Sequence, residues 1–224
     1  MDQSLTIDKN EAETIQIIHK KIYPNWYKIL EIHPDTYLNL MKPLYDILEG
    51  KKVSKSEPDQ FSKQGWMSFN KTTEEEWEEY HKKIQIARAF SMAWGDFHQS
   101  LMGSFPGWTN YKRGHNTGCD IGKEDGTCVV EIKNNVNTMN SSSKESVLRK
   151  LKLQKDLGKR AVIVIINGDI SSSTKDGIET LNGKQFYEEL SGRSTFMEDL
   201  LLTTNKTFEC YNTLDSLKSS LKIF

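Results

Sequence analysis

Two carboxylates and a lysine stand at a spacing that suits metal-assisted chemistry. Asp120 precedes the triplet Glu131-Ile132-Lys133. Side chains alternate between the two faces of a strand, so Glu131 and Lys133 would point one way while Ile132 points into the core. Magnesium prefers hard oxygen ligands, and Asp120, Glu131 and the carbonyl of Ile132 would hold such an ion. The ion would lower the pKa of a bound water, which Lys133 would orient.

The residues between Asp120 and Lys133 predict a β-hairpin that brings these groups together. Asp125-Gly126 is a strong turn signal, and β-branched residues follow it. A turn centred there pairs Asp120 with Glu131, and a turn one residue earlier pairs it with Val129. Both registers place Asp120 on the face of Glu131 and Lys133. The alternative interpretation is an ordinary ion pair on an exposed strand face.

A helix and then a buried strand are predicted after the hairpin. The capping-box pattern Ser142-x-x-Glu145 opens a helix that runs to about Leu157. An apolar run over residues 161–166 predicts a strand buried on both faces, as in α/β sheets. A polar loop is expected over residues 167–180, followed by short helices around 186–190 and 196–202. The buried face of the first helix is predicted to carry Val147, Leu148 and Leu151.

The N-terminal part of the chain is predicted to be largely helical. Apolar side chains recur at helical spacing within residues 10–50, and Glu49–Gln64 is polar enough for a linker or mobile loop. A long helix is expected to begin near Thr72 or Thr73, which are good N-caps. We therefore predict a helical N-terminal region with a polar linker over residues 1–70, and a catalytic core over residues 71–224. The predicted fold class is α/β (α+β), with a mixed central sheet flanked by helices.

Composition excludes several classes of protein. The chain has 224 residues and a formal net charge of −1, and no apolar run reaches the ~20 residues that span a bilayer. The first residues have neither a basic nor an apolar segment, so no signal peptide is expected. Three cysteines without a C-x-x-C pair suggest reduced thiols and a cytoplasmic protein. The near-zero net charge hides a basic stretch, since residues 144–160 hold seven basic and two acidic side chains.

The catalytic spacing resembles that of the metal-dependent PD-(D/E)xK nuclease superfamily. The run from Glu131 to Ser143 resembles, more narrowly, the small type II restriction endonucleases of the group that cuts GGNCC-type sites. Asn135 stands where that group carries a basic residue. The segment Asn182–Gly192 is similar to a late helix of the same group. The resemblance covers roughly residues 85–200.

This resemblance implies a restriction-endonuclease-like core and a homodimer acting on double-stranded DNA. It implies magnesium-dependent cutting of both strands at a short palindrome, with Mn²⁺ able to substitute for Mg²⁺. A chain of this length would carry one active site, so cutting both strands suggests two chains related by a two-fold axis. A cognate DNA methyltransferase would be its genetic partner, because the host needs protection. No membrane partner is expected.

The polar run after the triplet predicts DNA contacts. Asn makes bidentate contacts to adenine, and Ser pairs with a base edge or a phosphate. A simpler interpretation is a loop that caps the next helix. The candidate DNA-binding residues are Asn134, Asn135, Asn137, Asn140, Ser141, Ser142, Ser143 and Lys144.

Four residues outside the hairpin are further candidates. Asp96 would lend an acid to the metal site, or it is a solvated acid on the long helix. His98 and His115 would act as bases, or they are structural or contact phosphate. Gln99 lies beside His98 at the end of the same helix.

Three functions remain open from the sequence. The leading hypothesis is a type II restriction endonuclease. A repair or junction-resolving nuclease of the same superfamily would use the same chemistry on another DNA structure. A non-catalytic DNA-binding protein would keep the fold without the reaction.

Overall fold

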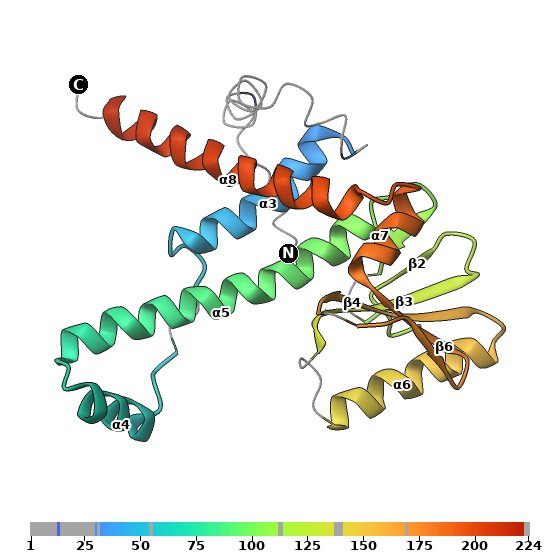
Figure 1. Cartoon of the computed structure of the whole chain (residues 1–224), viewed down its shortest axis with the longest axis horizontal. Coiled ribbons are helices and arrows are strands. Elements are labelled where there is room, and N and C mark those ends of the chain that lie inside the picture. The colour runs from blue at the N-terminus through green and yellow to red at the C-terminus, as the bar shows by residue number, and fades with distance from the viewer. Residues whose placement is uncertain are drawn as a thin grey trace. The chain divides into compact units, whose positions relative to one another are not determined.

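The computed structural model describes residues 13, 30, 32–53, 56–111, 114–136, 141–168 and 170–221 (Figure 1). For residues 34, 141 and 214–221 it describes the backbone alone. The chain forms two compact units, Met1–Met41 with Gly95–Phe224, and Lys42–Trp94. Each unit is described by itself. The predicted division of the chain at residue 70 stays a prediction.

A six-stranded mixed sheet organises the first unit. Its strand order is β1-β2-β3-β4-β6-β5. The strands β1, β2 and β3 pair antiparallel, β3, β4 and β6 pair parallel, and β5 pairs antiparallel with β6. The predicted mixed sheet flanked by helices is therefore confirmed. The strand bounds are β1 Trp108–Asn110, β2 Ile121–Lys123, β3 Cys128–Asn135, β4 Arg160–Asn167, β5 Ser173–Lys175 and β6 Ile178–Asn182.

Helices cover both faces of this sheet (Figure 1). On one face, α6 (Ser141–Asp156) packs Val147 and Leu151 against Val129 and alternate residues of β4. On the other face lies α7 (Gly183–Ser191), whose buried Phe186 meets the Trp108 ring edge-on. Strand β4 is buried on both faces, as its apolar run predicted. The strand carrying Glu131 and Lys133 therefore lies in the middle of the sheet, next to α6.

The predicted hairpin forms in one of its two predicted registers. Ile121 pairs with Val130 and Gly122 pairs with Val129, which is the register that would set Asp120 opposite Glu131. The regular strand pairing ends at Ile121, and Asp120 contacts β3 through its backbone N–H, which donates to the carbonyl of Val130 at 3.0 Å, and through its side chain. Gly126 adopts φ +75° in the turn, a conformation that glycine takes without strain.

Three predictions about the elements after the hairpin need correction. The polar loop predicted over residues 167–180 contains β5 and the start of β6. Strand β6 is paired on both sides, and β5 is a short exposed strand at the edge of the sheet, so neither needs a long apolar run. Helix α6 begins at Ser141, one residue before the predicted cap. Leu148 is 37% exposed, and the stripe of α6 that faces the sheet carries Lys150 and Gln154 instead.

The helix predicted over residues 196–202 is the beginning of a longer one, α8 (Phe196–Leu221). Its continuation is rich in Thr and Asn, which lowers helix propensity. These hydroxyls form hydrogen bonds within the helix: Thr203 donates to the carbonyl of Asp199 at 2.7 Å, and Thr207 donates to that of Thr203 at 2.8 Å. The Thr207 hydroxyl also bonds the hydroxyl of Tyr37 at 2.9 Å, in the buried core.

The second unit is helical. It contains part of α3 (Pro34–Leu48), all of α4 (Gln60–Asn70) and the first part of α5 (Glu74–Met102). Thr73 and Glu76 form the reciprocal hydrogen bonds of a capping box before α5, close to where a helix start was predicted. The linker predicted over Glu49–Gln64 is shorter than expected, because Asp59 caps α4 and the helix starts at Gln60. No helix among the described residues is both long and apolar enough to cross a bilayer.

Candidate active site

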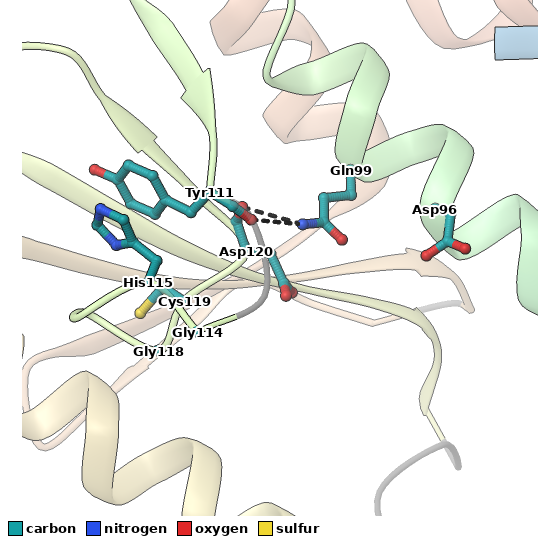
Figure 2. Close-up of a pocket in the computed structure, with 8 residues that line it drawn as sticks. All are labelled: Asp96, Gln99, Tyr111, Gly114, His115, Gly118, Cys119 and Asp120. Carbon is teal, nitrogen blue, oxygen red and sulfur yellow. Dashed lines mark hydrogen bonds between the residues drawn. The ribbon is translucent and has the colours of Figure 1, made fainter. Parts of the chain in front are cut away.

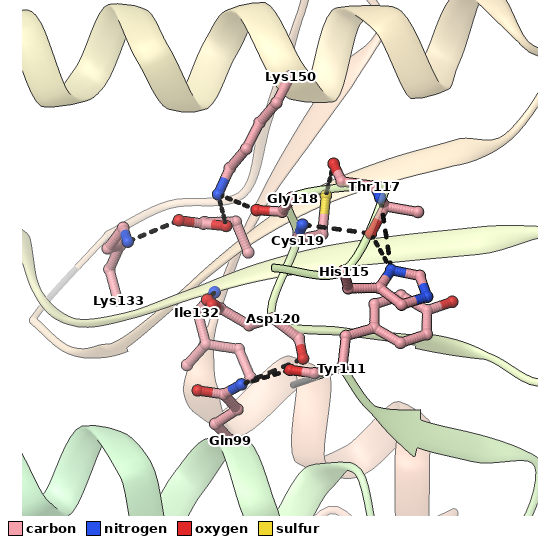
Figure 3. Close-up of polar contacts among 11 residues, drawn as sticks. Gln99, Tyr111, His115, Thr117, Gly118, Cys119, Asp120, Ile132, Lys133 and Lys150 are labelled. Carbon is pink, nitrogen blue, oxygen red and sulfur yellow. Dashed lines mark hydrogen bonds and ion pairs between the residues drawn. The ribbon is translucent and has the colours of Figure 1, made fainter. Parts of the chain in front are cut away.

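Glu131 is a buried acid held by two lysines, Lys133 and Lys150. Figure 3 shows both lysines. The Glu131 side chain is 3% exposed, on the face of β3 that packs against α6. Lys133 donates a hydrogen bond to Oε1 at 2.7 Å, and the Lys150 ammonium forms an ion pair with Oε2. A buried carboxylate is costly unless it is paired, so these two cations are what permit the acid in the sheet. Sequence reasoning placed Lys133 here correctly, and it did not find Lys150.

Lys150 comes to the site from helix α6. It falls on the sheet-facing stripe of the helix, three residues after Val147 and next to the fully buried Leu151. Its Nζ also donates to the carbonyl of Gly118 at 2.5 Å. A lysine within an otherwise buried stripe is the sequence signal that would have found this residue. The basic stretch over residues 144–160 indicated only a charged surface.

Asp120 joins the same cluster from the strand before. Its Oδ2 accepts a hydrogen bond from the backbone N–H of Ile132 at 2.7 Å. Burial raises the pKa of the Asp120 carboxyl, and the neighbouring Glu131 carboxylate raises it further. The Ile132 N–H, Lys133 and Lys150 act in the opposite direction without cancelling the rise. Two acids and two lysines thus share one small region of the sheet.

Gln99 holds the backbone of Asp120 from helix α5. Its Nε2 lies 3.2 Å from the carbonyl of Asp120, 3.4 Å from that of Tyr111 and 3.0 Å from Oδ1 of Asn110. These contacts join the end of α5 to the end of β1 and to the residue that precedes β2. Gln99 was a candidate without a role, and its contacts are those of a positioning residue.

A cavity of about 360 Å³ opens beside Asp120 (Figure 2). The Tyr111 and His115 rings stack with centroids 3.9 Å apart, and Nδ1 of His115 lies 2.8 Å from the Thr117 hydroxyl. Three of the four further candidates therefore share this cavity with Asp120. The lining residues are Asp96, Gln99, Tyr111, Gly114, His115, Gly118, Cys119 and Asp120.

His98 is the fourth candidate, and its surroundings are those of the core. Its Nδ1 lies 2.8 Å from the hydroxyl of Tyr187, and both side chains are buried. Burial lowers the pKa of His98 to about 4, so the imidazole is neutral near pH 7. Of the three interpretations for His98, these contacts favour the structural one.

The polar run is only partly described by the structure. Asn134 accepts a hydrogen bond at 2.8 Å from Asn167, which ends the adjacent parallel strand. Asn135 is exposed, and so are Ser142, Ser143 and Lys144 in the first turn of α6. Ser141 begins that helix, and Asn137 and Asn140 lie outside the described residues. Asn167 is a polar neighbour that the sequence did not single out.

The sequence of this chain matches a known protein family. The sequence model of the family described as Eco47II restriction endonuclease matches residues 28–211. The chain belongs to this family. The resemblance to restriction endonucleases predicted from Glu131–Ser143 is thereby confirmed.

One curated relative of this Eco47II-family chain is the type II restriction enzyme Sau96I of Staphylococcus aureus. The two are 31% identical over 100 residues, which is 45% of this chain and 38% of Sau96I. The chain thus aligns with well under half the length of that relative. No solved structure matches the chain.

The oxygen donors at the site suit a divalent metal ion. Oε2 of Glu131 is buried and receives no well-aligned hydrogen bond, although the Lys150 ammonium lies against it. Within the described ranges, no group of three or more His, Cys, Asp or Glu side chains is placed to hold a metal. The available donors are therefore two carboxylates and the carbonyl of Ile132. Mg²⁺ is commonly bound through one or two carboxylates while it keeps several waters, so this donor set fits it.

Proposed function

We propose that this chain is a type II restriction endonuclease that makes magnesium-dependent double-strand cuts at a short palindromic, GGNCC-like DNA site. The observation that carries the proposal is the buried Glu131 carboxylate, bonded to Lys133 and adjacent to Asp120. Membership of the Eco47II family supports the same function. A surface ion pair would not need a carboxylate that is 3% exposed.

Asp120, Glu131 and the carbonyl of Ile132 would hold the metal ion. When bound, the ion supplies neutralising charge at the scissile phosphate and lowers the pKa of a bound water. Mn²⁺ would substitute for Mg²⁺, since carboxylate, carbonyl and water ligands suit both ions.

Lys133 acts on the water and on the developing charge. Its ammonium lies 2.7 Å from Oε1 of Glu131 and its side chain is 23% exposed, so Lys133 lies at the edge of the site. From there it orients the attacking water and stabilises negative charge on the phosphate. Its compact charge suits this role better than the broad fork of an arginine.

The cavity beside Asp120 gives the remaining candidates their roles. Gln99 positions the Asp120 backbone through its carbonyl. Asp96 and His115 line the same cavity, where His115 would contact phosphate and Asp96 would be the solvated acid of the two interpretations. His98 has no part in the reaction, because it is bonded to Tyr187 in the core.

DNA would approach along the polar run and the first turn of α6. Asn134, Asn135 and Lys144 lie at or beyond the carboxyl end of the catalytic strand, with Ser142 and Ser143 beside them. The rest of the proposed contact set is Asn137, Asn140 and Ser141. Two chains related by a two-fold axis would each cut one strand of the palindrome. A cognate methyltransferase would protect the same site in the host.

Digestion of plasmid and phage DNA tests this proposal. The chain is incubated with DNA in Mg²⁺, in Mn²⁺ and in a chelator, and the cut ends are sequenced. Discrete, reproducible bands that need the metal are expected. Cutting that follows branched structures would support a junction-resolving nuclease, and binding without cutting would support a non-catalytic DNA-binding protein.

Alanine variants test the site within the same assay. Lys133→Ala and Asp120→Ala are each expected to abolish the bands. Lys83→Ala, on the exposed face of α5 in the other unit, is the control and should cut normally. Bands that survive both site variants would overturn the assignment of the catalytic residues.

A further inference from the structure

Lys150 places a cation at the carboxylate oxygen that the proposed metal ion needs. We propose that Lys150 competes with the divalent ion for Oε2 of Glu131. The Lys150 ammonium neutralises this oxygen when no metal is bound, and it moves away from the oxygen when the metal ion binds. This inference rests on the proposed metal site. It assigns a second lysine to that site, contributed by the helix after the catalytic strand rather than by the strand itself.

Two acceptor groups fix the position of the Lys150 ammonium (Figure 3). Its Nζ donates to the carbonyl of Gly118 at 2.5 Å and pairs with Oε2 of Glu131. Gly118 adopts φ +65°, a left-handed conformation that favours glycine, and its N–H donates to the carbonyl of His115 at 2.9 Å. A Cβ at Gly118 would lie 3.5 Å from Cδ of Lys150, so the lysine stem packs closely along this turn.

The two oxygens of Glu131 are not equivalent. Oε1 receives a hydrogen bond from Lys133 at 2.7 Å. Oε2 is buried and forms the ion pair with Lys150, and no described residue gives it a well-aligned hydrogen bond. Oε2 therefore keeps its capacity to bind a cation, and Lys150 is the cation beside it. A divalent ion bound there would repel the Lys150 ammonium strongly, because burial reduces screening.

Lys150 is able to leave Oε2 at small cost. Its side chain is 25% exposed, whereas that of Glu131 is 3% exposed. The lysine stem is flexible, and the Gly118 carbonyl offers its ammonium a second acceptor. The opposite role, a permanent bond that stays when metal binds, would make Lys150 part of the fixed frame of the site. The two roles predict opposite effects of removing its charge on metal affinity.

Binding of Mn²⁺ alone, measured by calorimetry on the full chain without DNA at pH 8, separates these roles. Lys150→Met removes the competing charge and is expected to lower the Kd for Mn²⁺ by at least about tenfold, because removal of a buried repulsion is worth that much. Lys152→Met is the matched control, because it makes the same change on an exposed position of the same helix. Its Kd should stay within about twofold of the original, given that exposed charges are screened.

An unchanged or weaker Mn²⁺ affinity in the Lys150→Met variant would overturn the inference. Circular dichroism checks that each variant is folded, and Lys150→Gln, which can still donate to the Gly118 carbonyl, replaces Lys150→Met if that variant does not fold. Asp120→Asn and Glu131→Gln separate this failure from failure of the metal site. If Mn²⁺ binding in the original chain is absent, or survives both of these changes, the proposed metal site is wrong and the inference falls with it.

Discussion

The side chain of Asp120 is tied to β3 by a hydrogen bond from the backbone N–H of Ile132 to Oδ2 at 2.7 Å, beside the backbone bond from Asp120 N–H to the carbonyl of Val130 at 3.0 Å. The side-chain bond crosses from the residue before β2 to the strand that carries Glu131 and Lys133. It fixes one oxygen of Asp120 while the pKa of the carboxyl is raised by burial and by Glu131. The amide oxygen of an asparagine would accept the same hydrogen bond. Asp120→Asn therefore removes the charge of this side chain and keeps its geometry.

Asp120→Asn should leave the fold intact and remove the reaction. The amide keeps the bond to Ile132, and loss of the carboxylate removes a proposed metal ligand. DNA cutting under single-turnover conditions is expected to fall by about 100-fold or more, because metal catalysis contributes several kcal/mol. Asp125→Asn, an exposed acid in the turn of the same hairpin, is the control and should cut normally. Normal cutting by Asp120→Asn would remove Asp120 from the site.

The raised pKa of Asp120 also predicts how Asp120→Asn changes the free energy of unfolding. A carboxyl whose pKa is raised on folding binds protons more tightly in the folded chain, so its contribution to the free energy of unfolding falls as pH rises through the raised pKa. Ionised Asp120 therefore costs stability near pH 8. Urea unfolding at pH 8 should show Asp120→Asn to be at least as stable as the original chain. A clear loss of stability would mean that the carboxylate is a net stabilising group.

Lys133→Met should be folded and inactive. Lys150 remains beside Glu131, so the buried acid keeps one counter-charge, while the group that orients water is lost. Cutting is expected to fall by about 100-fold or more. Lys133→Arg should be similarly impaired, since the guanidinium has a different shape and hydration. Full activity of the arginine variant would show that any positive charge suffices here.

Leu151→Ala tests how strongly α6 is held on the sheet. Leu151 is fully buried against Val129 and β4, so its truncation should lower the free energy of unfolding by about 2–5 kcal/mol. Leu153→Ala is the matched control on the same helix, where the side chain is 60% exposed and the cost should be below about 0.5 kcal/mol. Equal losses in urea unfolding would contradict the packing of α6 described above.

His98 predicts a pH-dependent loss of stability. Its pKa is about 4 in the folded chain against an ordinary value of 6.5, so between these values the unfolded chain binds a proton that the folded chain does not. The free energy of unfolding should therefore fall as pH drops from about 6.5 to about 4, by up to about 3 kcal/mol. His98→Gln should reduce this slope in urea unfolding measured at several pH values. An identical slope in the variant would show that another group causes the loss.

Much of the core and of the site could be predicted from local patterns. The hairpin, the buried strand β4 and the shared face of Glu131 and Lys133 follow from turn chemistry and strand alternation, which act over few residues. These patterns left two registers open for the hairpin, and the structure has the one that would set Asp120 opposite Glu131. The basic fold class follows from the order of these elements.

The rest depends on contacts that no local pattern encodes. Strand β6 is defined by pairing with β4 and β5 rather than by its own apolar residues. The length of α8 depends on Thr hydroxyls that bond within the helix and, at Thr207, to Tyr37 from the other end of the chain. Lys150 was missed because its role requires a buried acid on another element. Gln99 was a candidate, but its role could not be predicted because its acceptors are mostly backbone carbonyls.

The charged cluster comes from one continuous segment of the chain, residues 118–150. This segment holds Asp120, Glu131, Lys133 and Lys150, together with Gly118, whose carbonyl binds Lys150. Local contacts close small loops and form early in folding, because little chain entropy is lost. Glu131 would therefore meet its counter-charges when the hairpin and α6 first dock, before β6 or α8 is in place. Glu131 would then have a counter-charge at every stage of its burial. The free-energy cost of desolvating an unpaired carboxylate would not add to the rate-limiting barrier to folding.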